Sequence, residues 1–433
     1  MCGRRSTDTE PIDTATGTNE RNQQMSRRLH NSRSEGIPPI TVVGVGGGGC
    51  NAVNRMISDK IRGVEFVAVN TDNQQLSSSR AETIVRIADA ESDGLGVGGD
   101  PERGARAAEN SRDEIRNIFS DVDMAFITAG MGGGTGTGAA PIVAEMARQA
   151  GALTIAVVTR PFEFEGVPRS SAAQDGIDRL NDVADTVIVI PNQRLIDRND
   201  RSLTVTQAFH RADDVLRQAV RGISDVLTVP GEINLDFNDV KKVMGGGGHA
   251  LMALGHGSGD NRAIDAVEEA IHSPLLEDSI HGATRVLYNV TSAGDLGMLE
   301  LSQIADFVRE KVHPNAEIIM GTVVDEDLDG DIHMTLIATG FVDAAEQSST
   351  YGAPAFAAAQ QTAPAFAEPA APLPPSREDI LENLTFNPVE PRSAEELATP
   401  AFLHHRQSVT TNNGGSAGGG KRRWDPNAAF GRD

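Results

Sequence analysis

The sequence predicts an α/β protein with a Rossmann-like parallel-sheet domain, a long central helix, a smaller α/β domain and disordered termini. Between residues 40 and 159, short apolar runs alternate with helical patterns, as they do in parallel sheets that helices cover on both faces. Apolar residues then recur at three- and four-residue steps over one long segment, which is typical of a helix. The two ends of the chain show neither pattern.

The first domain is expected over residues 39–203, after a polar arm over residues 1–38 that is expected to be disordered. Apolar runs suited to buried strands lie at residues 40–45, 64–70, 83–88, 123–130 and 153–159. Helical patterns separate these runs at residues 51–61, 101–120 and 140–151. This alternation predicts one parallel sheet with helices on both sides.

The long helix is expected over residues 204–229, because Pro230 and Gly231 end the pattern. At a rise of ~1.5 Å per residue, it spans roughly 34 Å, which is a full domain diameter. Its apolar stripe consists of Phe209, Ala212, Leu216, Ala219, Ile223 and Val226.

The smaller α/β domain is expected over residues 230–342. Its strand patterns lie at residues 284–290, 316–324 and 331–339, and its helical patterns lie at residues 262–273 and 299–312. Residues 343–433 are rich in Ala, Pro, Gln and Ser, a composition that cannot bury a core and that predicts a disordered linker and tail.

The charge and cysteine content of the chain narrow its function. Among 433 residues, 38 are Lys or Arg and 61 are Asp or Glu, so the formal net charge is -23. Nucleic-acid binding needs clustered positive charge, and we therefore expect no nucleic-acid partner. The two cysteines fit a reducing cytoplasm, and the absence of a signal peptide or a long apolar run predicts no membrane insertion.

A first glycine-rich turn, "GVGGGGCNAV", lies between a predicted strand and a predicted helix. Gly44, Gly46 and Gly49 satisfy the G-x-G-x-x-G pattern, and Asp72 ends the next strand, which is the layout of a dinucleotide-binding fingerprint. The motif alone leaves two alternatives open. It is either the cofactor site of an NAD-dependent oxidoreductase or a tight turn without a ligand.

A second glycine-rich turn, "AGMGGGTGTGAAP", spans Ala129–Pro141 and again leads from strand to helix. A third, "DGLGVGGDP", has a similar character. Backbone N–H groups of two such turns in one sheet can face one phosphate chain from two sides. A dehydrogenase needs only the first turn, and no G-K-[ST] follows these glycines as it would in a P-loop enzyme.

A short acidic stretch, "NLDFNDVKK", follows the long helix. Asp236 and Asp239 lie three residues apart, beside Asn234, and no His or Cys in the stretch completes a metal site. Two interpretations are compatible with each other. The carboxylates cap a helix start, where its positive end favours them, or they act on a substrate.

The motif "GGGTGTG" resembles the signature of the tubulin/FtsZ superfamily, and residues 40–342 as a whole are similar to bacterial FtsZ proteins. "GVGGGGCNAVNRM", "AVNTD", "GLGVGGDP", "AGMGGGTGTGAAP", "RPFEFEG" and "NLDFNDVKKVM" occur in the order of that family. The resemblance implies a GTPase that binds GTP and GDP with Mg²⁺, polymerises head to tail and forms the division ring at mid-cell in the cytoplasm.

The resemblance also implies a set of nucleotide-binding residues. They are Gly47, Gly48, Gly49, Cys50 and Asn51 at the first turn, Gly134, Thr135, Gly136, Thr137 and Gly138 at the second, and Glu165, Arg169, Asn192, Phe209 and Asp213. A carboxylate such as Asp213 can accept from both the ring N–H and the amino group of guanine, a pair that adenine lacks. Without the resemblance, Asp213 reads as a solvated helix residue beside Asp214.

Two segments depart from the family pattern or lie outside its main part. Cys50 stands where the family has a small residue, and it is either a tolerated small side chain or a thiolate activated by a helix N-terminus. "TPAFLHHRQS", residues 399–408, resembles the peptide that docks membrane-tethering division proteins. The repeated Pro-Ala-Phe of the linker allows the alternative that this segment is linker drift.

The length of the central helix gives the acidic stretch a role. If Phe209 and Asp213 touch the nucleotide, Asn234, Asp236 and Asp239 lie beyond the far end of the helix, away from the nucleotide of their own subunit. They can reach the nucleotide of the next subunit in a head-to-tail stack, where the family resemblance assigns them catalysis. The remaining alternative is a scaffold that binds nucleotide and polymerises without hydrolysis.

Overall fold

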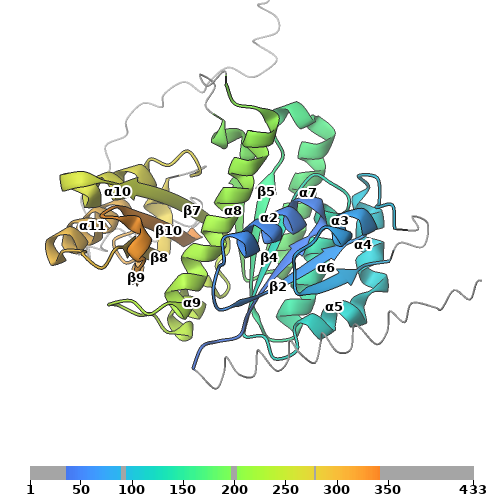
Figure 1. The fold of residues 1–433 in the computed structure, drawn as a ribbon, viewed down its shortest axis with the longest axis horizontal. Helices are drawn as coiled ribbons and strands as arrows, with labels where there is room; N and C mark the ends of the chain where they lie inside the picture. The colour runs from blue at the N-terminus through green and yellow to red at the C-terminus, as the bar shows by residue number, and fades with distance from the viewer. Residues whose placement is uncertain (1–35, 89–93, 197–201, 277–278, 342–433) are drawn as a thin grey trace, which may run out of the picture. The chain divides into compact units, whose positions relative to one another are not determined.

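The computed structural model describes residues 36–88, 94–196, 202–276 and 279–341. Ten strands in this part of the chain form one sheet in the order β3-β2-β1-β4-β5-β6-β7-β10-β8-β9. The expected N-terminal arm, the linker and the segment 399–408 lie outside the described residues, apart from a few residues at the end of the arm. The mixed α/β fold with a largely parallel first half is confirmed (Figure 1).

The first six strands are parallel throughout. They are β1 (Ile40–Val45), β2 (Val64–Asn70), β3 (Thr83–Arg86), β4 (Met124–Gly130), β5 (Leu153–Arg160) and β6 (Thr186–Pro191). Side chains of a strand alternate between the two faces of the sheet. Accordingly, Val43 and Val45 of β1 enter one hydrophobic cluster, whereas Ile40 and Val42 enter another on the opposite face.

Helices cover both faces of this half, as the alternating pattern predicted. The cluster around Val43 also holds apolar residues of α4 (Pro101–Asn110), α5 (Arg112–Ile118), α6 (Thr135–Gln149) and α7 (Val167–Val183). The cluster around Val42 holds residues of α2 (Gly46–Ser58), α3 (Asn73–Ser77), α8 (Val205–Thr228) and α9 (Phe237–Met244). The sequence patterns did not reveal α3, α7 or β6.

The helix predicted over residues 101–120 is wrong as a single element. It is broken at Ser111 into α4 and α5. The Ser111 hydroxyl accepts the Ala88 N–H at 3.1 Å, and its backbone leaves helical geometry at φ -110° and ψ 20°. A serine that bonds to backbone outside its own helix competes with helix continuation, which explains the break.

The long central helix is confirmed as α8, which has 24 residues. Thr204 begins it: its hydroxyl accepts the Gln207 N–H at 3.3 Å, and the Gln207 side chain accepts the Thr204 N–H at 2.8 Å. This reciprocal cap satisfies two backbone donors at the helix start. The helix contacts α2 and β5 of the first half and β8 and β9 of the second.

The second half of the sheet is mixed. It consists of β7 (Gly248–Gly257), β8 (Ala283–Ser292), β9 (Glu317–Val324) and β10 (Ile332–Phe341). Strand β10 is antiparallel to both β7 and β8, and β9 is parallel to β8. The helices α10 (Arg262–Ile271) and α11 (Met298–Lys311) supply apolar residues to its core, which centres on Tyr288.

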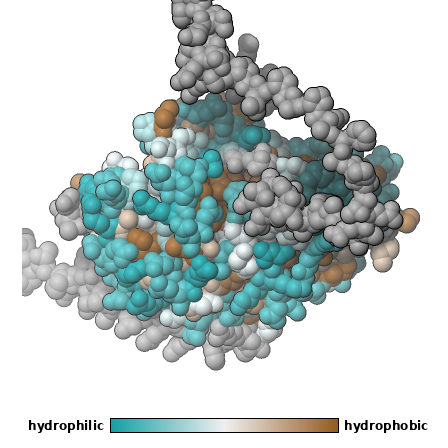
Figure 2. Space-filling model, turned by 180° about the vertical axis from the view of Figure 1, so that it is seen from behind, coloured by the Kyte–Doolittle hydropathy of each residue, from teal (hydrophilic) through white to brown (hydrophobic). Residues whose placement is uncertain are grey.

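The surface is mainly hydrophilic, as a highly charged chain requires. The face turned away in Figure 1 shows a largely hydrophilic surface with small, separate hydrophobic areas (Figure 2). No helix in the described part of the chain combines the length and the apolar character needed to cross a membrane.

Candidate functional site

A polar cavity of about 520 Å³ opens at the carboxyl ends of the parallel strands. Residues that directly follow β1, β2, β4, β5 and β6 line it, among them Gly47, Asp72, Met131, Pro161 and Asn192. Ligands of open parallel sheets bind at this edge, because the turns into the following helices converge there. The topology therefore places the cavity where the glycine-rich turns meet.

The two main glycine turns lie against each other. A Cβ built at Gly46 would approach the backbone nitrogen of Gly136 to 2.7 Å, and one at Gly48 would lie 3.2 Å from the nitrogen of Gly130. Gly46 also has a φ of +71°, which side-chain-bearing residues rarely adopt. Only glycines allow this approach, and it brings the N-terminal ends of α2 and α6 to one cavity, where their N–H groups suit an anion.

Some predicted residues of these turns line the cavity and others do not. Gly47, Gly48, Asn51, Gly134, Thr135 and Gly136 line it. Gly49 and Gly138 instead allow close packing, since a Cβ there would meet Thr128 O at 2.3 Å and Pro101 O at 1.9 Å, respectively. The Thr137 hydroxyl accepts the Gly132 N–H at 2.8 Å and thereby stabilises the second glycine turn.

Cys50 is a core residue, which corrects its assignment to the ligand. Its side chain is 2% exposed and enters the cluster around Val42, and its Sγ lies 3.6 Å from Gly44 O. Burial raises the pKa of this thiol to about 12, against a smaller opposing effect of the Val69 backbone contact. The thiolate alternative is therefore wrong, because the neutral thiol is the stable form at physiological pH.

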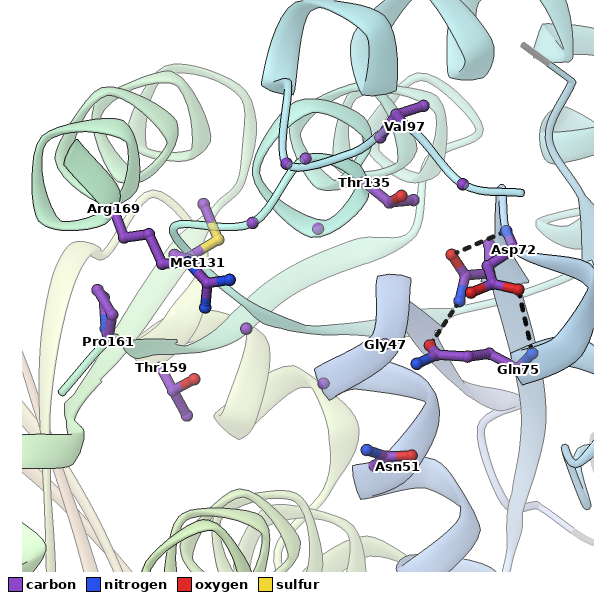
Figure 3. A pocket seen from close by; sticks show the side chains of 18 of the residues that line it. Gly47, Asn51, Asp72, Gln75, Val97, Met131, Thr135, Thr159, Pro161 and Arg169 are labelled. Atoms are coloured by element: carbon purple, nitrogen blue, oxygen red, sulfur yellow. Dashed lines mark hydrogen bonds between the residues drawn. The ribbon is translucent and has the colours of Figure 1, made fainter. Parts of the chain in front are cut away.

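One wall of the cavity comes from the segment between β5 and α7. Glu165 accepts the Phe162 N–H at 3.0 Å and pairs with Arg169 Nη1 at 2.5 Å. Figure 3 shows Arg169 reaching from α7 toward the cavity beside Met131. Arg169 lies against the second glycine turn, since a Cβ built at Gly132 would lie 3.3 Å from its Cβ, and its guanidinium is suited to a phosphate group.

The opposite wall contains Asp72, which the sequence patterns singled out, and three residues that they did not assign to a ligand, Asn70, Thr71 and Gln75. The Asn70 amide donates to Gln75 Oε1 at 3.0 Å (Figure 3). Thr71 shares a hydroxyl–hydroxyl bond of 2.7 Å with Thr135. Asp72 caps α3 by accepting from Gln74 N–H at 2.8 Å. Asn70, Thr71 and Asp72 belong to "AVNTD", a stretch of the family resemblance at the end of a predicted strand, whereas Gln75 carries no sequence signal.

At one end of the cavity lie an aromatic ring, a side-chain amide and a carboxylate. Asn192 is 4% exposed, and no other described residue satisfies its Oδ1. Phe209 presents an exposed ring at the first turns of α8, in edge contact with Phe162 at 5.2 Å. A buried polar atom without a partner is costly, so the Asn192 amide is suited to a ligand that completes its bonds.

Asp213 lies at the same end of the cavity, one turn beyond Phe209 on α8. Burial raises the pKa of its carboxyl to about 6; Arg55 opposes this shift and Asp214 adds to it. Above pH 6 the group is therefore mainly a carboxylate, which accepts two hydrogen bonds from one ligand edge.

The predicted acidic residues do not reach this cavity. Asp236 caps α9 by accepting the Asp239 N–H at 2.9 Å, and Asn234 accepts the Gly231 N–H at 2.7 Å. All three precede or begin α9, beyond the C-terminal end of α8, whereas Asp213 lies near the N-terminal end of α8. The structure thus separates the predicted catalytic residues from the predicted binding residues.

Comparisons with known proteins identify the family. Residues 39–200 match the model of the tubulin/FtsZ family GTPase domain, and residues 248–342 match that of the FtsZ family C-terminal domain. An FtsZ dimer from M. jannaschii is 42% identical, with 73% of this chain and 92% of that chain covered and a TM-score of 0.68. The chain belongs to the tubulin/FtsZ family. It is a GTPase, a class of enzyme that binds guanine nucleotide.

Further solved structures agree with this fold. A tryptophan-to-tyrosine mutant of FtsZ from M. jannaschii is also 42% identical, with a TM-score of 0.69 over 73% of this chain and 96% of that one. CetZ1 from Haloferax volcanii is 20% identical, with a TM-score of 0.62 over 70% and 95%. The likeness to CetZ1, at this low identity, shows the fold alone. The dinucleotide-binding alternative for the first glycine turn is wrong, since both turns serve one GTPase cavity.

Proposed function

We propose that this FtsZ-family GTPase polymerises head to tail into the filaments of the division ring, and that GTP is hydrolysed between subunits. The observation that carries the proposal is the separation along α8. About fifteen residues of helix, or roughly 22 Å at ~1.5 Å each, lie between Asp213 and the end of the helix. Asp236 and Asp239 follow only after that end, so they act on the nucleotide of a neighbouring subunit.

The hydrogen bonds of the acidic loop suit this division of labour. Asp236 uses one oxygen to cap α9, whereas no hydrogen bond or ion pair among the described residues engages the Asp239 carboxylate. Asn234 uses its Oδ1 on Gly231, which leaves its NH₂ group as a donor. We assign Asp239 to the activation of the attacking water, Asp236 to its orientation, and Asn234 to its positioning.

The phosphate end of the cavity fits a nucleotide that carries Mg²⁺. No group of three His, Cys, Asp or Glu side chains in the described ranges is placed to hold a metal ion. Mg²⁺ is bound by few carboxylates together with substrate phosphates, and it neutralises charge on the phosphates. Asp72, beside Thr71 and the N-terminus of α6, is the carboxylate that would hold it.

Two exposed apolar pairs support assembly. Phe164 and Val167, in the segment that also carries the cavity-lining Glu165 and Arg169, are 61% and 81% exposed, and Met298 and Leu299, at the start of α11, are 81% and 82% exposed. Exposed apolar pairs of this kind mark contact surfaces. Since the two pairs belong to different domains, contact between them is heterologous, and heterologous contacts without closure give open filaments.

We further propose that the protein acts on the cytoplasmic side of the mid-cell division site and makes one further contact there. The segment 399–408, "TPAFLHHRQS", docks membrane-tethering division proteins through Phe402 and Leu403, with basic residues at the rim. This role keeps the ring at the membrane without insertion of the chain itself.

A titration of protein concentration tests the proposal. GTP turnover per subunit is expected to stay near zero below a critical concentration and to rise steeply above it, in step with light scattering from filaments. Inorganic phosphate release, measured over a range of dilutions at constant excess GTP and Mg²⁺, reports this. Turnover per subunit that is the same at all dilutions would show that each subunit hydrolyses GTP alone, and the proposal would fail.

A further inference from the structure

Two neighbouring aspartates on α8 have different partners. Asp214 pairs with Arg55 Nη1 at 3.1 Å and lies 3.8 Å from Arg217 Nε. By contrast, no hydrogen bond or ion pair within the described ranges engages the Asp213 carboxylate, which lines the nucleotide cavity. The arginines thus bind Asp214 and leave Asp213 available to a ligand.

Arg55 is fixed across the face of α8 at more than one point. Its Nη1 donates to His210 O at 3.4 Å as well as to Asp214, and its Nη2 contacts His210 Nδ1. A guanidinium only donates, so Nδ1 of His210 is the acceptor in this contact. His210 and Asp214 are four residues apart, on one face of the helix, and Asp213 directly precedes Asp214.

A second cavity, of about 630 Å³, brings these groups together. Arg55, His210, Asp213 and Asp214 line it, and Asn51 and Asp213 also line the nucleotide cavity. Its other charged groups have their own partners. Arg80 Nη1 donates to Ser58 at 2.7 Å, and Asp59 pairs with Arg217 at 2.9 Å. Arg55 is therefore the cation that is held beside Asp213.

The position of Arg55 on α2 links the two ends of the nucleotide site. Gly47 and Gly48, at the N-terminus of α2, line the phosphate end, and Asn51 follows one turn later. Arg55 is four residues after Asn51, on the same helix face, and reaches α8. One rigid helix thereby connects the glycine turn to the base-recognising carboxylate.

We propose that Arg55 is a positioning residue for base recognition, which neutralises Asp214 and holds Asp213 as an ionised acceptor at the base end of the cavity. This rests on the assignment of Asp213 to guanine. Without the guanidinium, Asp214 keeps only the more distant Arg217, which also pairs with Asp59, so its charge acts more strongly on Asp213 and disfavours both the ionisation and the fixed orientation of that carboxyl. The role requires a cation at residue 55, and the hydrogen bonds to His210 and Asp214 set its geometry.

Calorimetric titration of the full chain with GDP and with inosine diphosphate tests the role. Inosine lacks the 2-amino group, so the ratio of the two affinities measures the bond to Asp213. In the native protein this ratio is expected to be about tenfold or more, as for a hydrogen bond to a charged group. In Arg55→Gln it is expected to fall at least roughly threefold, because Asp213 loses its fixed geometry.

The pH profile separates positioning from packing. Loss of Arg55 removes the influence that lowers the pKa of Asp213, so the fall of GDP affinity on acidification is expected to begin about one pH unit higher. Arg55→Lys keeps the charge and is expected to restore the native pH midpoint. Arg80→Gln, in the same cavity but bonded to Ser58, is the matched control and is expected to change neither readout.

Each outcome decides between distinct conclusions. A uniform loss of affinity in Arg55→Gln at every pH, with an unchanged preference for GDP over inosine diphosphate, would show a merely structural arginine and overturn the inference. Equal affinity of the native protein for the two nucleotides would instead remove the assignment of Asp213 to guanine, on which the inference rests. Loss of folding in Arg55→Gln, checked by circular dichroism, leaves the Arg55→Lys and Arg55→Met pair to decide between charge and geometry.

Discussion

The two ends of α8 place acidic side chains in opposite settings. At the N-terminal end, Asp213 is half-buried in a walled cavity, together with Phe209 and Asn192. Beyond the C-terminal end, Asn234 and Asp236 are exposed and Asp239 is only partly buried, and none of the three lines this cavity. One end has a cavity shaped for a ligand, and the other has exposed polar groups that line no part of that cavity.

Under the proposed function, this difference separates nucleotide binding from hydrolysis along one helix. Recognition needs enclosure, because desolvated walls strengthen hydrogen bonds and reject wrong partners. A loop that serves a neighbouring subunit has to stay open until that subunit supplies the other wall. The exposure of the acidic loop is thus expected for one half of a site that a neighbouring subunit completes. Substitutions at either end of α8, or in the contacts between its two ends, test this separation.

The largest effect is expected at the open end. Asp239→Ala removes the carboxylate that is free to activate water, and turnover is expected to fall at least about 100-fold, the usual contribution of a general base. GTP affinity is expected to remain native, and filaments to persist longer. Phosphate release and nucleotide binding, measured on the same preparation, check both expectations.

Asn238→Ala is the matched control, because Asn238 is an exposed neighbour in the same first turn of α9. It is expected to leave turnover near the native rate. If Asp239→Ala hydrolysed GTP at the native rate, Asp239 would have no catalytic role and would be only a residue of the first turn of α9.

An intermediate effect is expected at the enclosed end. Asp213→Asn keeps the shape but replaces one acceptor oxygen with a donor that faces the donors of guanine. GDP affinity is expected to fall roughly 10- to 100-fold, since hydrogen bonds to charged groups are stronger than neutral ones. Competition between GDP and ADP, measured by fluorescence or calorimetry, is expected to show reduced discrimination.

An exposed acid elsewhere, Asp265 on α10, provides the control as Asp265→Asn. The two ends also differ in a way that one experiment can reveal. At saturating GTP, Asp213→Asn is expected to recover most of its turnover, whereas Asp239→Ala is not. Equal loss in both variants at saturation would contradict the separation of binding from chemistry.

Local patterns in the sequence predicted several elements that form the site, but not α3, α7 or β6, and not which side chains face the cavity. The strand at Ile40–Val45 and the helix α8 follow directly from apolar periodicity. Whether a turn glycine meets ligand or backbone depends on helices that cross it from elsewhere, as Pro101 does at Gly138. For this reason, the set of nucleotide-binding residues implied by the resemblance included Cys50, whose side chain is buried against the sheet.

The residues that sequence reasoning missed share one physical cause. Asn70 and Thr71 lie in "AVNTD", which by itself indicates no ligand contact, and Gln75 lies in no motif; only the order of the parallel strands brings the end of β2 beside the end of β1. The acidic loop shows the reverse case. Its sequence suggested chemistry, and the helix length, which is a local property, already excluded the cavity of its own subunit.

The smallest effect is expected in the link between the two ends. Arg221, on α8, donates to Asp225 at 2.9 Å on its own helix and to Asp325 at 2.7 Å in the second domain. Asp225 is 6% exposed, so the loss of its partner leaves a buried carboxylate poorly compensated. Because the Arg221 side chain itself is 43% exposed, solvent screens part of the pair, and Arg221→Gln is expected to lower the free energy of unfolding by about 1 kcal/mol.

Chemical denaturation measures this loss, with Arg309→Gln as the control. Arg309 pairs with Asp306 at 3.0 Å, but the two side chains are 69% and 67% exposed, respectively. An exposed pair contributes little, so this control is expected to change stability by less than about 0.5 kcal/mol. GDP affinity is expected to stay native in Arg221→Gln, because the cavity lies at the other end of α8. A coupled loss of GDP affinity would show that the two ends act as one unit, and the comparison would have to be redrawn around the helix as a mechanical link.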